Sequence, residues 1–230
     1  MADIRIVDLG GSIVVPDKVD TAFLKEFRDF ITNWLREKDD RKLVFIIGGG
    51  APARTYQKAF TEMNSGADSY DLDQIGIAAT RLNAQFVKAV FGELCSDPLV
   101  TDPSGAVPFT GRILVAGGWK PGFSTDYVSV VLAGKFRAEI VYNLSNIVKV
   151  FTADPKKDPE ARPLDRITWD TYKKMCGDKW IPGFNTPFDP VATARAAEAG
   201  MKVMVASGRD IPNLKKLFNG EPFTGTVMEP

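Results

Sequence analysis

Leu43-Val44-Phe45-Ile46-Ile47-Gly48-Gly49-Gly50 is the stretch that decides the fold class. A short, unbroken run of apolar residues predicts a strand that is buried on both faces, because a half-exposed strand would alternate with polar residues. The glycines that end the run predict a sharp turn whose backbone can approach a ligand closely. A helical stretch that carries Arg54 follows, and this order of strand, turn and helix indicates a βαβ unit.

The same arrangement occurs at two other places. Residues 4–9 predict a buried strand that ends in Gly10-Gly11-Ser12, and residues 112–116 predict another that ends in Gly117-Gly118. One glycine pair at the end of a strand is more often structural than functional, and it is the recurrence that indicates a site. Ligands of open α/β sheets bind beyond the carboxyl ends of the strands, where unpaired N–H groups favour phosphate. We therefore expect one shared phosphate site.

The spacing of apolar residues predicts the remaining elements. We expect helices at 21–38, about 73–94, 168–175, 189–199 and 211–218, and strands at 138–144 and 202–206. Strands that alternate with helices predict a mainly parallel sheet with helices on both faces. The expected fold is thus an α/β three-layer sandwich with a mainly parallel central sheet, in a single domain over residues 1–230.

The composition excludes several classes of function. The 230 residues include 29 basic and 29 acidic ones, and this balance argues against a nucleic acid or an anionic membrane as the main partner. The chain has no histidine, so it contains neither a Ser-His-Asp nor a Cys-His nucleophile, nor an imidazole-ligated metal. Its two cysteines, Cys95 and Cys176, lie far apart and are expected to be reduced thiols. Without a basic and apolar leader or a long apolar run, the protein is expected in the cytoplasm.

The glycine turns match neither of the two common nucleotide-binding motifs. No Gly-Lys-Ser/Thr of a P-loop is present, and no Gly-x-Gly-x-x-Gly follows the first strand. The remaining chemical equipment is carboxylates, lysine, arginine, backbone amides and oxygen-bound cations such as Mg²⁺. This equipment suits phosphoryl transfer, which needs alignment and charge neutralisation more than it needs a base.

A series of segments, in order along nearly the whole chain, resembles the amino acid kinase superfamily, and within it the UMP (uridylate) kinases of the archaeal type. The segments are VDLGGSIVVP (7–16), GGGAPARTY (48–56), DQIGIAATRLNAQ (73–85), GGWKPGFSTD (117–126), FTADPKKDPEA (151–161) and GTVMEP (225–230). The order and spacing make this match more specific than any one motif. It includes Asp8, at a position where many other members of the superfamily carry a lysine.

The resemblance implies an ATP- and Mg²⁺-dependent kinase that transfers the γ-phosphoryl group of ATP to UMP and forms UDP in pyrimidine nucleotide biosynthesis. The acceptor side would be an N-lobe of about 1–135 and the donor side a C-lobe of about 136–230. The implied partners are the small-molecule nucleotides UMP and ATP and further copies of the chain, in an expected hexamer.

The resemblance also assigns the site residues. The donor ATP would be bound by Gly10, Gly11, Ser12, Gly49, Arg54, Ser145, Asn146, Phe151 and Asp154. The acceptor would be bound by Gly48, Asp73, Gly117, Gly118, Trp119, Lys120, Pro121, Gly122, Phe123 and Ser124. The catalytic residues would be Gly10, Gly11, Arg54 and Asp126, and no side chain is assigned as a metal ligand.

Two places depart from the family pattern and keep alternatives open. Trp119 replaces a threonine and Phe123 a common polar residue, so the acceptor could be a different small phosphate or acid. Val148-Lys149 replaces an Asp-Gly step, and because β-branched valine resists positive φ, this loop must follow a different path or continue the strand. A non-catalytic relative that binds or senses a nucleotide is the third reading.

Overall fold

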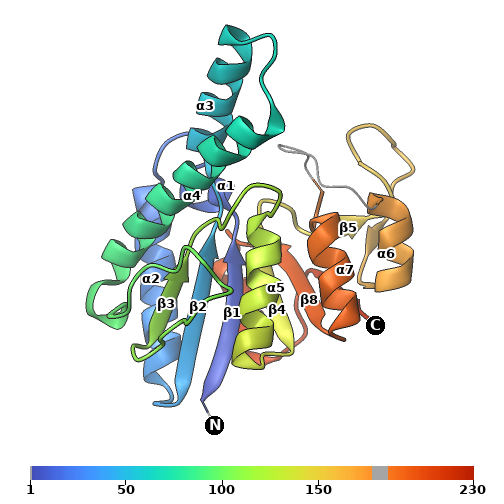
Figure 1. Cartoon of the computed structure of the whole chain (residues 1–230). Helices are drawn as coiled ribbons and strands as arrows, with labels where there is room; N and C mark the ends of the chain where they lie inside the picture. The colour runs from blue at the N-terminus through green and yellow to red at the C-terminus, as the bar shows by residue number, and fades with distance from the viewer. Residues whose placement is uncertain (1, 178–185) are drawn as a thin grey trace.

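The computed structural model describes residues 2–177 and 186–230 and has three layers, a central sheet with helices on both faces (Figure 1). Within the described residues, seven strands form the sheet in the order β3-β2-β1-β4-β8-β9-β7. All neighbours are parallel except β8 and β9. The prediction of an α/β sandwich around a mainly parallel sheet is confirmed.

The strands are short and buried. In sheet order they are β3 (Ile113–Ala116), β2 (Arg41–Ile47), β1 (Asp3–Leu9), β4 (Ile140–Ser145), β8 (Lys202–Ser207), β9 (Thr226–Glu229) and β7 (Arg166–Thr168). A separate antiparallel pair consists of β5 (Val150–Phe151) and β6 (Pro163–Leu164). Every residue from Leu43 to Ile47 is buried, as the apolar run predicts for a strand covered on both faces.

The helices cover the two faces of the sheet. They are α1 (Gly11–Val14), α2 (Thr21–Arg36), α3 (Gly50–Met63), α4 (Ser69–Phe91), α5 (Thr125–Phe136), α6 (Trp169–Cys176), α7 (Pro190–Glu198) and α8 (Ile211–Asn219), with a 3₁₀ turn at Gly92–Leu94. One hydrophobic core joins α2 and α8 to the sheet, and the second joins α5 and α7 to the opposite face. In Figure 1 the hairpin of α3 and the first half of α4 extends beyond the layered body.

Successive residues of each strand enter different cores. Val7 and Leu9 of β1 belong to the core beneath α2, whereas Ile6 belongs to the core beneath α5. Side chains of a strand alternate between the two faces of the sheet, so Asp8 lies on the same face as Ile6. The last polar side chain of β1 is therefore directed to the α5 side.

Helix α5 is absent from the elements that the sequence predicts. Its buried residues include Val128, Ser129, Val130, Leu132 and Ala133, so apolar side chains point in almost every direction. A helix of this kind is enclosed by other elements and shows no periodic polar face in the sequence.

Helix α4 begins at Ser69, four residues ahead of the expected start at about 73, because Asp68 caps it by accepting a hydrogen bond from the Asp71 N–H. No helix among the described residues is long and apolar enough to cross a membrane.

Candidate active site

The first two glycine turns lie side by side at the carboxyl edge of the sheet. They follow β1 and β2, which are neighbours, and the Gly48 N–H donates to the Leu9 carbonyl at 3.0 Å. A Cβ atom at Gly11 would lie 2.1 Å from the Gly50 nitrogen, and one at Gly50, whose φ is +61°, would lie 2.4 Å from the Gly11 oxygen. Only glycine permits this backbone-to-backbone contact. The structure thus brings together the two turns to which donor-phosphate contacts are assigned.

The third glycine turn packs on α4. A Cβ atom at Gly118 would lie 2.8 Å from the Thr80 hydroxyl oxygen. That hydroxyl accepts a hydrogen bond from the Gly118 N–H at 2.7 Å and donates one to the Ile77 carbonyl at 2.6 Å. Gly117 and Gly118 are both buried, and the loop that follows them lies over this buried pair.

Side chains of α4 bind the second and the third glycine turn to the same helix. The Asn83 amide is buried and donates to the carbonyls of Gly48 and Gly49, both at 2.9 Å. The Arg81 guanidinium donates to the carbonyls of Gly118 at 3.1 Å and Trp119 at 2.8 Å. Neither residue is among those that the sequence assigns to the site. The signal was present in DQIGIAATRLNAQ as polar side chains on the inner face of a helix, a position that requires hydrogen-bond partners.

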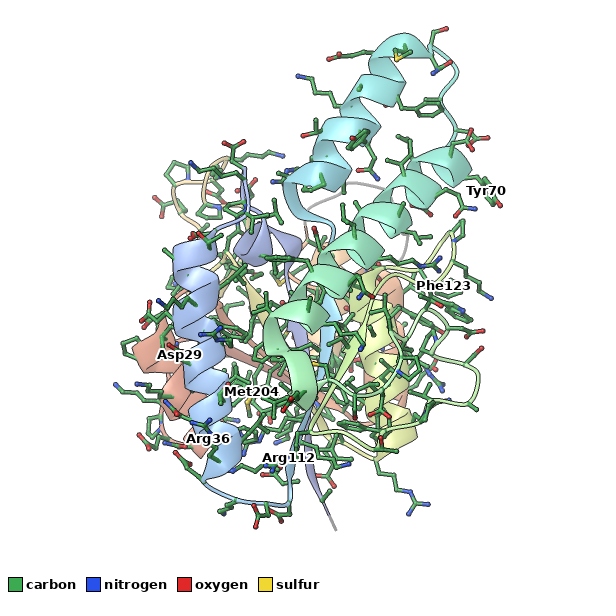
Figure 2. All side chains as sticks on the ribbon, turned by 90° about the vertical axis from the view of Figure 1, so that its left-hand side faces the viewer. Asp29, Arg36, Tyr70, Arg112, Phe123 and Met204 are labelled. Atoms are coloured by element: carbon green, nitrogen blue, oxygen red, sulfur yellow. The ribbon has the colours of Figure 1, made fainter. Side chains whose placement is uncertain are left out.

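The loop assigned to the acceptor spans residues 117–124 and is held at its tip by Asp73. Oδ2 of Asp73 accepts a hydrogen bond from the Gly122 N–H at 2.6 Å. Figure 2, which labels Phe123 of this loop, shows that the loop runs alongside α4. The structure therefore places Asp73 next to the acceptor loop, as the assignment of both to one subsite requires.

Aromatic side chains fill the space between this loop and α5. The Phe123 ring lies 5.0 Å from the ring of Trp119 and 4.5 Å from the ring of Tyr127, centroid to centroid. The Lys120 ammonium lies 4.0 Å from the centroid of the Trp119 ring, in the range of a cation–π contact. Trp119 also packs against the core beneath α5. We call Trp119, Phe123 and Tyr127 the aromatic wall.

Three carboxyl groups meet below the first glycine turn, and we call Asp8, Asp126 and Asp189 the carboxyl cluster. Asp126 lies in the first turn of α5, and its Oδ2 accepts a hydrogen bond from the Asp189 N–H at 2.7 Å. Asp189 caps α7 through the Ala192 N–H at 2.6 Å. Asp8 is only 3% exposed at the end of β1 and contacts the Asp126 carboxyl.

The environment of the cluster opposes negative charge. Burial raises the pKa of Asp8 well above its usual range, and the neighbouring Asp126 raises it further. Burial, followed by the charge of Asp189, raises the pKa of Asp126 to about 7. Burial also raises the pKa of Asp189. The sequence assigns Asp126 to the site but not Asp189, because residues 63 positions apart in the chain carry no local sign of their contact.

The other side chains assigned to the donor lie around the same edge. Arg54 is exposed on α3 and donates to the Pro16 carbonyl at 2.9 Å, which holds it beside the segment that follows the first turn. Ser12 lies in α1, and Ser145 ends β4, where its Cβ is 3.4 Å from the position that a Cβ on Gly10 would take.

The segment assigned to adenosine does not continue strand β4, which leaves a different path as the remaining one of the two expected outcomes. Residues 146–149 form a bend between β4 and β5, and among the described residues Arg137 is the only non-glycine with positive φ. Val148 and Lys149 thus avoid the left-handed region, as expected for side chains that replace Asp-Gly. Lys149 forms an ion pair with Asp165, and the Val150 N–H donates to the Thr226 hydroxyl at 2.9 Å.

Beyond this bend, the two other residues assigned to adenosine differ in their surroundings. Phe151 pairs with Pro163 in the β5–β6 ribbon and is partly buried. Asp154 is exposed, and its Oδ1 accepts a hydrogen bond from the Lys156 N–H at 3.0 Å. The Asp154 carboxylate therefore faces solvent at the rim of the donor side.

Comparisons with known proteins agree with the fold and cover nearly the whole chain. The sequence matches the Amino acid kinase family over residues 3–207. The uridylate kinase of Methanospirillum hungatei is 32% identical over 226 residues, which cover 97% of this chain and 93% of that protein. The uridylate kinase of Pyrococcus abyssi is 31% identical over 230 residues, which cover 98% and 100%. The crystal structure of the uridylate kinase from Archaeoglobus fulgidus matches with a TM-score of 0.78 at 28% identity, over 99% of this chain and 100% of that chain.

Proposed function

The chain belongs to the amino acid kinase family, and we propose from this premise that it is a UMP kinase that transfers the γ-phosphoryl group of ATP to UMP and forms UDP. The observation that carries the proposal is the full-length similarity to archaeal uridylate kinases at more than 30% identity. Pyrimidine nucleotide biosynthesis is the route that such a product would serve.

The donor phosphates would lie over the first two glycine turns. Backbone N–H groups of Gly11, Ser12 and Gly49 would face them, and the start of α3 adds the partial positive charge of a helix N-terminus. Gly10, whose own N–H donates to the Leu144 carbonyl at 2.8 Å, would form the turn beneath the phosphates. Arg54 has guanidinium donors left after its bond to Pro16, and a planar guanidinium can grip phosphate with two hydrogen bonds. The adenosine would extend toward Ser145, Asn146, Phe151 and Asp154.

Mg²⁺ is expected to arrive with ATP. Among the described residues, no group of three or more acidic, cysteine or histidine side chains is arranged to hold a metal ion. Mg²⁺ in kinases is commonly held by substrate phosphates with few protein ligands, and the residues present fit such a nucleotide-borne ion. When bound, it would neutralise part of the phosphate charge.

The acceptor would bind between Asp73 and the loop 117–124. An acceptor phosphate is already a competent nucleophile near neutral pH, so the site needs to align two anions rather than remove a proton. Asp126, half-buried at the start of α5, would face the transferred group from below. The two anions would meet above the carboxyl cluster, between the first and third glycine turns.

An acceptor panel tests the proposal. We expect ADP release from ATP with UMP, and much slower release with CMP, dUMP, AMP and GMP. The aromatic wall favours one alternative, a kinase of another small phosphate or acid, because Trp119 and Phe123 add bulk beside the acceptor loop. Turnover with another acceptor but not with UMP would establish that alternative. ATP binding without transfer to any acceptor would instead indicate a nucleotide sensor.

We also propose that the protein is a cytoplasmic homo-oligomer, with a hexamer as the expected assembly. Support comes from large exposed apolar side chains on the α3–α4 hairpin and on the rest of α4. These are Tyr56, Met63, Tyr70, Leu82 and Phe86. Leu82 is 66% exposed, and burial of such a side chain against another copy would stabilise the assembly. Light scattering on the purified protein tests the assembly, and a monomer at micromolar concentration would exclude it.

A further inference from the structure

Asp8 and Asp126 are placed in contact beneath the first glycine turn, where Asp8 is 3% exposed and Asp126 is half-buried. Asp8 is the last polar residue of β1, two positions before the first glycine turn, and it is enclosed on the α5 face of the sheet. Asp126 reaches the same point from the first turn of α5. Oδ2 of Asp8 is buried without a hydrogen-bond donor among the described residues.

Two ionised carboxylates in this arrangement would repel each other with little solvent between them. The contact becomes favourable when one carboxyl keeps its proton and donates it to the other. Oδ2 of Asp126 also accepts a hydrogen bond from the Asp189 N–H at 2.7 Å. An ionised Asp126 with a protonated Asp8 would therefore have a donor on each side.

Among the residues that the structure describes, the groups that face this pair from neighbouring elements carry no positive charge. Asp189, before α7, is a third carboxyl with one buried oxygen that lacks a donor among the described residues. Tyr172 and Cys176 come from α6, and burial raises the pKa of each of them, so both are neutral near pH 7. The Tyr172 hydroxyl is occupied by the backbone N–H and carbonyl of Phe188, both at 2.9 Å.

We propose that Asp8 is a positioning residue that shares a proton with Asp126, and that this acid pair carries at most one negative charge beneath the phosphoryl-transfer site at neutral pH. The inference rests on the proposed function and deepens it. Nucleotide phosphates are anionic, and a second negative charge below the glycine turns would repel them. Loss of the shared proton to the solvent in alkaline solution would add that charge and weaken transfer.

The pH dependence of kcat/KM with ATP and UMP tests the proposal through the Asp8→Asn variant. Asparagine keeps the shape of the side chain and can donate an N–H to Asp126, but it has no proton to lose in this range. For the wild type we expect kcat/KM to decline between pH 7 and pH 9. For Asp8→Asn we expect the ratio of kcat/KM at pH 9 to kcat/KM at pH 7 to be at least threefold higher than the same ratio in the wild type.

Asp97→Asn is the matched control. Asp97 is equally a buried aspartate, but it accepts hydrogen bonds from Thr110 and Gly111 and lies outside the site. Its replacement should leave the pH 9 to pH 7 ratio at the wild-type value. An Asp8→Asn profile that declines just as the wild type does would overturn the proposal.

Infrared spectroscopy of the nucleotide-free protein separates this proposal from the proposed function. We expect a protonated-carboxyl band in the wild type at pH 8 that is weaker in Asp8→Asn and unchanged in Asp97→Asn. If the wild type shows no such band at pH 8, the acid pair is excluded even when UMP is phosphorylated. If the band is present and weaker in Asp8→Asn but no acceptor is phosphorylated, the pair stands and the proposed function fails. Absence of the band in the wild type excludes the pair even if Asp8→Asn does not fold.

Discussion

The carboxylate of Asp73 and the backbone of Gly122 are joined by a hydrogen bond of 2.6 Å, which ties α4 to the tip of the acceptor loop. The residue assigned to the ribose of the acceptor thus already has a partner within the protein. One carboxylate oxygen is used by the loop, and the other is left for a ligand. Asp73 can therefore order the loop and bind the acceptor through the same side chain.

We expect Asp73→Asn to raise KM for UMP about tenfold, a loss of roughly 1.4 kcal/mol, with little change in kcat or in KM for ATP. The amide removes the charge and one acceptor that the Gly122 N–H and a ribose hydroxyl would use. Steady-state kinetics with each substrate varied in turn measures the effect. Asp71→Asn, two positions earlier on the exposed surface of the same helix, is the control and should behave as the wild type. An effect confined to KM for ATP would show that the two subsites are assigned the wrong way round.

Arg54→Ala is expected to lower kcat on the order of 10²-fold, because charge stabilisation of the transferred group is lost. Arg54→Lys should recover only part of the rate, since an ammonium cannot grip phosphate in the bidentate way of a guanidinium. The control is Lys58→Ala, which removes an exposed cation from the same helix. The Lys58 ammonium lies 3.7 Å from the Glu62 carboxylate. A wild-type kcat in Arg54→Ala would remove this residue from the catalytic set.

Asn83→Asp should destabilise the fold and the site together. The change replaces the donor amide with a carboxylate facing the carbonyls of Gly48 and Gly49, which would lose their shared donor in a buried position. We expect a loss of about 1–3 kcal/mol in the free energy of unfolding, measured in urea, and a lower kcat/KM. Gln85→Glu makes the same chemical change at an exposed position two residues along the helix. Equal stability of the two variants would contradict the role given to Asn83.

Asp8→Asn is expected to stabilise the protein at neutral pH. A carboxyl whose pKa is raised on folding binds its proton more tightly in the folded state, so stability falls as the pH rises from the unfolded pKa to the folded pKa. At a pH above both pKa values, each unit of the shift lowers the free energy of unfolding by about 1.4 kcal/mol, and asparagine removes this cost. The gain in the free energy of unfolding should therefore be largest at pH 7 to 8 and should shrink toward pH 4.

Asp97→Asn should instead lower the free energy of unfolding at neutral pH. Hydrogen bonds from Gly111 and Thr110 outweigh the effect of burial and lower the pKa of Asp97, so its carboxylate stabilises the fold above its unfolded pKa and loses this effect as the pH falls. Denaturation of both variants in urea across pH 4 to 8 checks the pair of predictions. A gain for Asp8→Asn that is independent of pH would show that the proton linkage is wrong.

The parts of the fold that the sequence predicts are those in which local pattern and tertiary environment agree. The apolar run at Leu43–Ile47 could only be a buried strand, and the three glycine turns follow strands that proved to be neighbours. Helix α5 was missed because an enclosed helix has no polar face to reveal its period. The avoidance of positive φ at Val148-Lys149 was predicted correctly, because it depends only on which backbone angles these side chains allow, whereas the sequence left open whether the chain would bend or continue the strand.

The site was predicted less completely than the fold. The resemblance supplied Asp126, whereas its contacts with Asp8 and Asp189 arise only when β1, α5 and the segment before α7 pack together. Arg81 and Asn83 were also missed, because their partners are backbone carbonyls of distant turns and no side-chain type marks such partners in a sequence. Contacts between elements that are distant in the chain need the tertiary structure.

The backbone contact between Gly11 and Gly50 has a consequence for changing what this enzyme accepts. Two turns that meet without side chains between them cannot be widened or narrowed by substitution, because any added atom collides with main chain. The acceptor loop is held instead by side chains, at Asp73, Thr80 and Arg81. Libraries aimed at new acceptors should therefore randomise Trp119, Lys120 and Phe123 and leave residues 10–12 and 48–50 untouched. The acceptor loop is the part of the site that can evolve, and the two glycine turns are the part that must stay the same.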